Sequence, residues 1–207
     1  LNFLKNKKIL FKNLNFKKSD FSNHKQIKSL IFKNNFYNLK NDYVQSFDFV
    51  NFSKELGGEI GINISKKNIF YWYKINRFKI NYPWSDDLTS KRLINLVYNY
   101  EFIVSVSSNN DRKFIDRIIM IHIKRVIYDF NNKKIDQITS FDIVASLLSF
   151  FILKKMNTKI INFLEIIFFN QIDSLGVHKS YNILEHSKFI NNLYELKNIF
   201  LYFNHSV

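Results

Sequence analysis

The sequence of 207 residues contains no cysteine, four glycines and a single proline. Without cysteine, the chain cannot form a disulfide, a cysteine-ligated zinc site, an iron–sulfur cluster or a thiol nucleophile. The scarcity of glycine leaves no Walker loop and no dinucleotide-binding fingerprint, and no Gly-x-Ser-x-Gly elbow occurs. Few glycines and prolines also mean few tight turns, which disfavours a many-stranded sandwich or barrel.

The chain is strongly basic, with 31 Lys and Arg against 17 Asp and Glu and a formal net charge of +14. Such a balance suggests an anionic partner: a nucleic acid, an acidic polymer or an anionic membrane. However, the chain has 26 Lys but only 5 Arg, and 28 Asn and 29 Ile against one Ala. A preference for AT-rich codons accounts for much of this bias. Arg, which binds phosphate bidentately, is scarce, so a nucleic acid is the less favoured partner.

Hydrophobic residues make up 46% of the chain, enough to bury a core. The longest apolar runs, residues 143–153 and 160–169, are shorter than the ~18–20 residues that span a bilayer. We therefore expect two buried helices and no transmembrane segment. Residues 1–16 lack the sustained apolar run of a signal peptide. The expected location is the cytoplasm by default, with the periplasm as the alternative.

Two regions of different character follow each other along the chain. Residues 1–45 are rich in Asn and Lys and poorly periodic, which predicts a loosely ordered N-terminal arm with one helix near residues 25–37. Residues 46–207 are expected to form a helical domain. Its first part, residues 46–82, holds three of the four glycines and many aromatic residues, so we expect it to be rich in loops.

From Trp84 onward, apolar residues recur at helical spacing and predict five consecutive helices. Short connections between them favour antiparallel hairpins and an all-α fold. The predicted helices begin, in order, at Asp86 or Asp87, before Ile115, near Ser140, at Thr158 and before Phe189. The second has an apolar face made of Ile115, Ile118, Ile119, His122 and Val126.

Histidines and aromatic residues are the candidates for chemistry. His178 and His186 flank a corner between helices, but no carboxylate completes a ligand set beside them, so we expect no metal site. His122 lies on an apolar helix face, where a packed core histidine is favoured over a ligand or base. The aromatic run Phe70–Tyr73, with Trp84 nearby, could stack on a sugar or a base, although packing against the helices is the favoured interpretation.

Two segments resemble the heparinase II/III family of polysaccharide lyases, in particular a bacterial branch. Residues 82–97 contain a Trp, a short polar link and a Ser/Thr-x-Arg-aliphatic helix start. Residues 171–182 are similar to the family's Gln-Ile-Leu-Pro-Asp-Gly-Gly-His-Ile-Ser-Arg-Asn-Pro corner. The matching residues are Trp84, Thr89 or Ser90, Arg92, Leu93 and Ile94, and then Gln171, Ile172, Gly176, His178, Ser180 and Asn182. Family residues are replaced at Leu175, Val177 and Tyr181.

The resemblance covers about residues 45–203 and implies an α/α toroid of helical hairpins followed by a large β-sandwich. The chain would be an incomplete toroid with a loop-rich N-terminal segment, and the β-sandwich would lie beyond Val207. The implied reaction is β-elimination on an acidic, uronic-acid-containing glycan, without metal or organic cofactor. In this reaction donors neutralise the uronate carboxylate, a Tyr or His takes the C5 proton, and an acid protonates the C4 oxygen.

By resemblance, the candidate catalytic residues are His178 and Tyr181, and the candidate substrate-binding residues are Arg92, Asn182, His186 and Trp84. The family's Asn-His pair has no counterpart, since the matching region at Thr139 and Ser140 offers only hydroxyls. The family's catalytic Tyr is not in register, and its sandwich His would lie beyond Val207. We therefore expect the chain alone to lack a complete active site.

Other hypotheses stay open from the sequence. The chain could be a non-catalytic basic helical module that binds an anionic polymer, either a glycan or a nucleic acid, as its charge suggests. It could be a remnant without present function, as the missing catalytic positions suggest. His178 itself could be a structural residue that hydrogen-bonds the corner loop.

Overall fold

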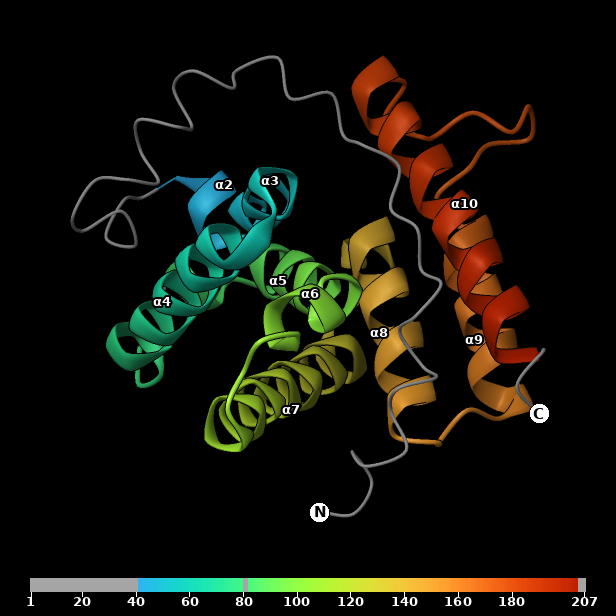
Figure 1. Cartoon of the computed structure of the whole chain (residues 1–207). Helices are drawn as coiled ribbons and strands as arrows, with labels where there is room; N and C mark the ends of the chain where they lie inside the picture. Colours follow the sequence, from blue (N-terminus) through green and yellow to red (C-terminus); the bar gives the residue numbers. More distant parts are fainter. Residues whose placement is uncertain (1–40, 80–81, 205–207) are drawn as a thin grey trace. The chain divides into compact units, whose positions relative to one another are not determined.

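A computed structural model describes residues 41–79 and 82–204, which fold into helices (Figure 1). No β-strand occurs in these ranges, and their isolated antiparallel bridge joins Ile172 and His178. The all-α fold expected from the sequence is therefore confirmed. Within the same ranges, no helix is both long and apolar enough to cross a membrane. The expected N-terminal arm over residues 1–45, with its helix, lies almost wholly outside the described residues.

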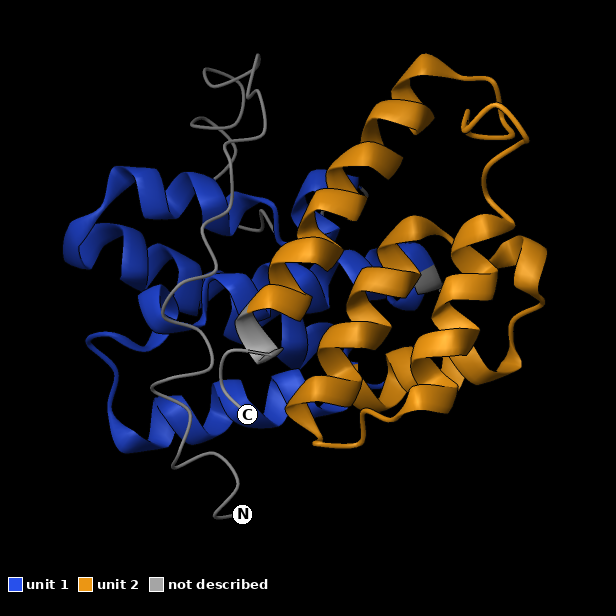
Figure 2. Ribbon diagram, turned by 90° about the vertical axis from the view of Figure 1, so that its right-hand side faces the viewer, with its two compact units in different colours: residues 1–122 blue, residues 123–207 orange. Residues whose placement is uncertain are grey.

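The chain divides into two units, Leu1–His122 and Ile123–Val207, coloured blue and orange in Figure 2. The first contains α2 (Asp42–Gln45), α3 (Phe49–Leu56), α4 (Gly58–Asn76), the 3-10 helix η3 (Tyr82–Trp84), α5 (Asp86–Tyr98), α6 (Tyr100–Val104) and the start of α7 (Asn109–Asn132). The second contains the end of α7, the 3-10 helix η4 (Ile135–Gln137), α8 (Ser140–Ile152), α9 (Thr158–Phe169) and α10 (Ile183–Asn204).

Residues 46–82 are mainly helical, which corrects the expectation of a loop-rich segment; α4 alone has 19 residues. Gly57 ends α3 with a φ of 68°, a left-handed conformation that glycine adopts without strain. Gly61 lets α4 approach α3 closely, because a Cβ atom at this position would overlap the backbone carbonyl of Ser53. The glycines therefore build a tight helical hairpin rather than a loop.

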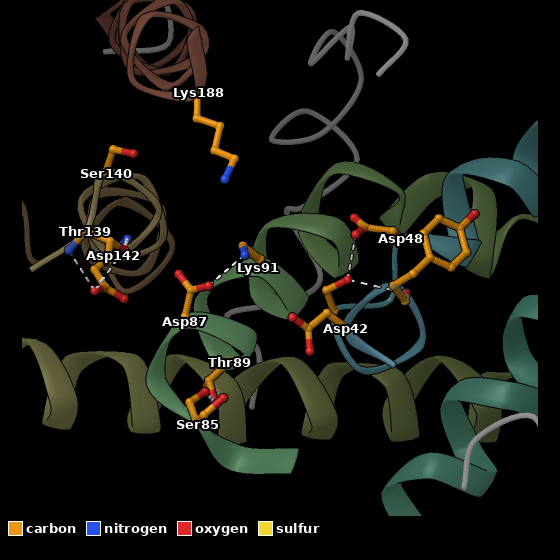
Figure 3. Close-up of polar contacts among 12 residues, drawn as sticks. Asp42, Asp48, Ser85, Asp87, Thr89, Lys91, Thr139, Ser140, Asp142 and Lys188 are labelled. Carbon is orange, nitrogen blue, oxygen red and sulfur yellow. Dashed lines mark hydrogen bonds and ion pairs between the residues drawn. The ribbon is translucent and has the colours of Figure 1, made fainter. Parts of the chain in front are cut away.

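The helix predicted from Asp86 is present but divides at Asn99 into α5 and α6. Its N-cap is Ser85 rather than an aspartate. Asp87 instead pairs with Lys91, with 2.6 Å between Oδ2 and Nζ (Figure 3). The amphipathic pattern of α7 is confirmed, since all five residues of its predicted apolar face are buried: Ile115, Ile118, Ile119, His122 and Val126.

In the second unit, α8 begins with a capping box that is drawn in Figure 3. Thr139 Oγ1 accepts from the Asp142 backbone N–H at 3.3 Å, and the Asp142 carboxylate accepts from the Thr139 N–H at 3.0 Å. Lys133 Nζ lies 2.6 Å from the same carboxylate. The helix is buried on nearly all sides, as its continuous apolar run predicts.

The expectation that α9 is a buried helix is wrong, because only Leu164 and Ile167 are buried. Its N-cap is Asn157, whose Oδ1 accepts a backbone N–H of the first turn at 3.0 Å, and not Thr158. The exposed apolar residues of α9 are Ile161, Phe163, Ile166 and Phe169.

α10 packs along α8 (Figures 1 and 2). Asn192 Nδ2 of α10 donates to Ser140 Oγ at 2.6 Å. Farther along, the rings of Phe151 and Phe200 meet edge to face with their centroids 5.9 Å apart. These contacts fix the helix that follows the candidate corner.

Candidate functional site

The chain reverses between α9 and α10 through residues 171–186, which we call the corner. The Asp173 backbone N–H donates to the Val177 carbonyl at 2.9 Å. The Asp173 carboxylate accepts from the backbone N–H groups of Leu175 and Val177, each at 2.9 Å. Gly176 has a φ of 77°, which a residue with a side chain would adopt only with strain. The corner is thus an ordered loop held by its own hydrogen bonds.

Contacts within the second unit anchor this loop. Gln171 Nε2 donates to the Ile138 carbonyl at 2.6 Å. Phe189 of α10 is buried and stacks on Phe168 of α9, with 4.7 Å between ring centroids. The His178 ring lies 5.5 Å from the Phe189 ring. The side chains of the corner therefore project from a supported backbone.

The two corner histidines are directly linked. His186 Nδ1 accepts from the His178 backbone N–H at 3.2 Å, and His178 Nδ1 accepts from the Ser180 backbone N–H at 3.2 Å. The Ser180 hydroxyl also lies 2.8 Å from His178 Nδ1. A backbone N–H can only donate, so while these contacts are made each Nδ1 accepts, and the ring that makes them has its N–H at Nε2. Both partly exposed rings thus offer an Nε2–H donor.

Asn182 and Tyr181 complete the set that the sequence predicts at the corner. Asn182 caps α10, since its Oδ1 accepts from the Leu184 backbone N–H at 2.9 Å. Tyr181 is 72% exposed, and its hydroxyl donates to the Asp173 carboxylate, which raises the pKa of Tyr181. The pKa of Asp173 is lowered, chiefly by the hydrogen bond from the Val177 backbone.

Arg92 and Trp84, the other predicted substrate-binding residues, lie in the first unit and are buried. Arg92 Nη1 donates to the Gln45 carbonyl at 2.6 Å, and Arg92 Nε donates to His122 Nε2 at 3.0 Å. Its Nη2 donates to Thr89 Oγ1 at 3.2 Å. The Arg92 side chain is wholly enclosed, so the structure places it in the core and not on a surface that a glycan could contact.

Aromatic rings enclose the same guanidinium. Its Cζ lies 4.3 Å from the ring centroid of Trp72, 5.2 Å from that of Trp84 and 5.8 Å from that of Phe47. The indole of Trp84 is fixed in turn, since its Nε1 donates to the Asn76 carbonyl at 2.6 Å. We call this group the Arg92 cage; it consists of Gln45, Phe47, Trp72, Trp84, Thr89, Arg92 and His122.

Burial sets the protonation states in the cage. It lowers the pKa of His122 to about 3, helped by the nearby charge of Arg92. His122 is therefore neutral: its Nδ1 donates to the Ile118 carbonyl at 2.8 Å, and its Nε2 accepts from Arg92. Burial also lowers the pKa of Arg92, but an arginine starts from so high a value that it stays charged. None of the ion pairs among the described residues includes Arg92.

The sequence contains only part of the signal for the cage, and the cage was not among its predictions. Arg92 is four residues from both Leu88 and Leu96, which are buried, so it lies on the buried face of α5. The positions of Gln45 and Phe47 had no comparable signal, because a turn before α3 brings them to the cage. Phe47 adopts a φ of 66° in that turn while its ring is fully buried.

Within residues 41–79 and 82–204, no group of three or more His, Asp or Glu side chains is arranged to hold a metal ion. No protein-family model, curated protein or solved structure matches the chain.

Proposed function

We propose that the chain is the helical portion of a polysaccharide lyase similar to the heparinase II/III family, and that its corner binds the carboxylate of a uronic acid. One observation carries this proposal: His178 and His186 present two Nε2–H donors within the segment that resembles the family's corner. The all-helical fold supports it more generally, and we infer that the hairpins belong to an incomplete α/α toroid.

The two N–H donors of the corner could stabilise the negative charge that develops during β-elimination. Removal of the C5 proton builds negative charge next to the uronate carboxylate, so hydrogen bonds to that carboxylate stabilise the transition state. Two neutral imidazoles can each donate one such bond. While the Nδ1 contacts persist, neither ring has a free lone pair to act as a base. We therefore assign His178 the role of carboxylate donor and not of general base.

The remaining roles follow from the same geometry. We assign Tyr181 the role of general acid at the C4 oxygen, as the resemblance implies. Its O–H donates to Asp173, which raises its pKa, so Tyr181 must release Asp173 before it can donate to the C4 oxygen. We assign the C5 proton to a group of the β-sandwich that the resemblance implies. Asn182 positions the corner by capping α10. Arg92 and Trp84 support the first unit from its core.

Carboxylate recognition can be tested by calorimetry with a hyaluronan oligosaccharide and with the same oligosaccharide after reduction of its carboxyl groups to alcohols. The chain should prefer the carboxylate form, and His178→Ala/His186→Ala should weaken that preference. His24→Ala/His205→Ala removes the two imidazoles that precede and follow the described residues in the sequence and should leave the preference unchanged. Equal binding of both oligosaccharides, or a preference as strong in the corner variant as in the parent chain, would overturn the assignment.

The reaction itself requires the product of the complete gene. Incubation with heparin, hyaluronan and alginate should produce the ultraviolet absorbance of an unsaturated uronate from one of them. A complete gene product that releases no unsaturated uronate from any acidic glycan of a broad panel refutes the lyase proposal.

A further inference from the structure

In the first unit, α4 carries alternating cations and aromatic rings on its exposed face. Lys67, Tyr71 and Lys74 are exposed at positions i, i+4 and i+7, so they form one stripe along the helix. Phe78 continues the stripe just past the helix end and is 83% exposed. The guanidinium of Arg77 lies 4.5 Å from the centroid of the Phe78 ring.

α7 adds further cations beside this stripe. The Phe114 ring of α7 packs edge to face against Phe70 and Tyr73 of α4, with centroid distances of 4.8 and 5.6 Å. Lys113 and Arg117 are exposed on either side of Phe114 in the sequence. α4 and α7, labelled in Figure 1, therefore meet through aromatic rings, and each helix also carries exposed cations.

The cations of this surface form no ion pair with any carboxylate of the described residues. These five cations are Lys67, Lys74, Arg77, Lys113 and Arg117. The nearby carboxylates have other partners, since Asp111 pairs with Lys66 at 3.5 Å and Asp116 accepts from the Tyr100 hydroxyl at 2.8 Å. Lysine is abundant throughout the chain, so what distinguishes this surface is the spacing of its cations and the rings among them.

We propose that this surface, which we call the α4–α7 surface, binds an acidic glycan chain at a place separate from the corner. The choice of a glycan rests on the proposed lyase function, while the anionic nature of the ligand follows from the five cations. Lys67 and Lys74 are seven residues apart, or ~10 Å along the helix, close to the length of one disaccharide unit. A glycan with one carboxylate per disaccharide can therefore place successive charges at both lysines. The exposed ring of Tyr71, which lies between them in the sequence, can pack on the apolar face of a sugar.

Salt-dependent binding tests this surface. The probe is a heparin oligosaccharide, and the variant is Lys67→Gln/Lys74→Gln/Arg117→Gln. We expect a loss of affinity of roughly tenfold at low salt and a shallower dependence of log K on log salt, because fewer counterions are released. The matched control Lys154→Gln/Lys155→Gln/Lys159→Gln removes three exposed cations of the second unit and should bind nearly as the parent chain does.

A ring variant separates stacking from charge. Phe78→Ala should weaken heparin binding without changing the salt dependence, since it removes no charge. Equal losses in the two triple variants would overturn the proposal by showing that only total charge matters. Equal or tighter binding of an oligothymidylate would also overturn it, in favour of a nucleic-acid surface.

Different results would refute the proposed lyase function and the proposed α4–α7 surface. His178→Ala/His186→Ala leaves the α4–α7 surface intact, so it should retain the heparin salt dependence of the parent chain. Retained heparin binding without lyase activity in the complete gene product would refute the proposed reaction only. Lyase activity with no effect of the α4–α7 variant on heparin binding would refute the second surface only.

Discussion

Removal of Arg92 tests whether a buried cation without a carboxylate partner stabilises the first unit. In Arg92→Ala, the Gln45 carbonyl and His122 Nε2 lose their donors inside the core. Each buried acceptor left without a partner costs about 1–3 kcal/mol. The cavity between the rings of Trp72 and Trp84 adds to this cost, whereas relief from burying an unpaired charge offsets part of it. We expect a net destabilisation of about 3–5 kcal/mol.

Two further variants at this position separate volume from charge. Arg92→Met fills most of the space between the rings and removes the charge, so it should cost about 2 kcal/mol less than Arg92→Ala. Arg92→Lys keeps the charge, but all three of its N–H donors sit on one nitrogen. They cannot reach the three acceptors that Nε, Nη1 and Nη2 of the guanidinium reach, and the ammonium is more strongly hydrated. It should therefore be at least as destabilising as Arg92→Met.

Urea unfolding followed by tryptophan fluorescence measures these effects. The chain has two tryptophans, and both belong to the Arg92 cage, so the signal reports this unit. With an m-value of about 2 kcal/mol/M, Arg92→Ala should lower the midpoint by about 2 M. A stable Arg92→Ala, or an Arg92→Lys as stable as the parent chain, would refute the reasoning from directional hydrogen bonds.

Three other predictions concern stability. His122→Gln should flatten the pH dependence of the free energy of unfolding. The pKa of His122 is about 3 in the folded chain and lies below the ordinary 6.5, so as the pH falls the unfolded chain binds the proton first. The contribution of neutral His122 to the free energy of unfolding is therefore largest above pH 6.5. It decreases toward pH 3 by up to about 1.4 kcal/mol per pH unit. Gly61→Ala should cost about 2–3 kcal/mol in urea unfolding, because its Cβ overlaps the Ser53 carbonyl. Thr139→Ala removes the acceptor for the Asp142 N–H and should cost about 1 kcal/mol by thermal denaturation.

Matched variants serve as controls for the second and third of these predictions. Ser65→Ala lies on the same buried face of α4 as Gly61 and should be nearly neutral, since the Ser65 hydroxyl has no hydrogen-bond partner among the described residues. Thr158→Ala changes a threonine that follows the cap of α9 and should be nearly neutral. An unchanged pH profile in His122→Gln, or equal effects in either control pair, would contradict the corresponding argument.

The sequence predicted helices where large apolar residues alone mark the buried face, as in α7. It failed for α4, whose buried positions include Ser65, Asn68 and Asn76, so the helical period is hidden by polar residues. It failed in the opposite way for α9, because an apolar run shows what a helix can bury but not whether a neighbour covers each face. Ile166 and Phe169 are exposed because of the tertiary packing around α9, and the periodicity of the sequence does not predict that packing.

The corner and the cage differed in how far the sequence could predict them. Residues 171–186 are close along the chain, so any ordered loop brings their side chains together. The placement of Arg92 on a glycan-binding surface came from a motif, which says nothing about burial. Arginine is rarely fully buried, and only the fold shows that Gln45, Thr89 and His122 supply three acceptors for it.

The histidine of the core and the two of the corner differ in which ring nitrogen donates. The Nδ1 of His122 faces a carbonyl and must donate, which leaves its Nε2 to accept from Arg92 in the core. The Nδ1 atoms of His178 and His186 face backbone N–H groups and must accept, which leaves their Nε2–H groups free to donate. A metal ion or an abstracted proton would need a lone pair on Nε2, and the corner would have to give up its backbone contacts to provide one. The backbone around the corner therefore favours recognition of an anion over metal binding or base catalysis.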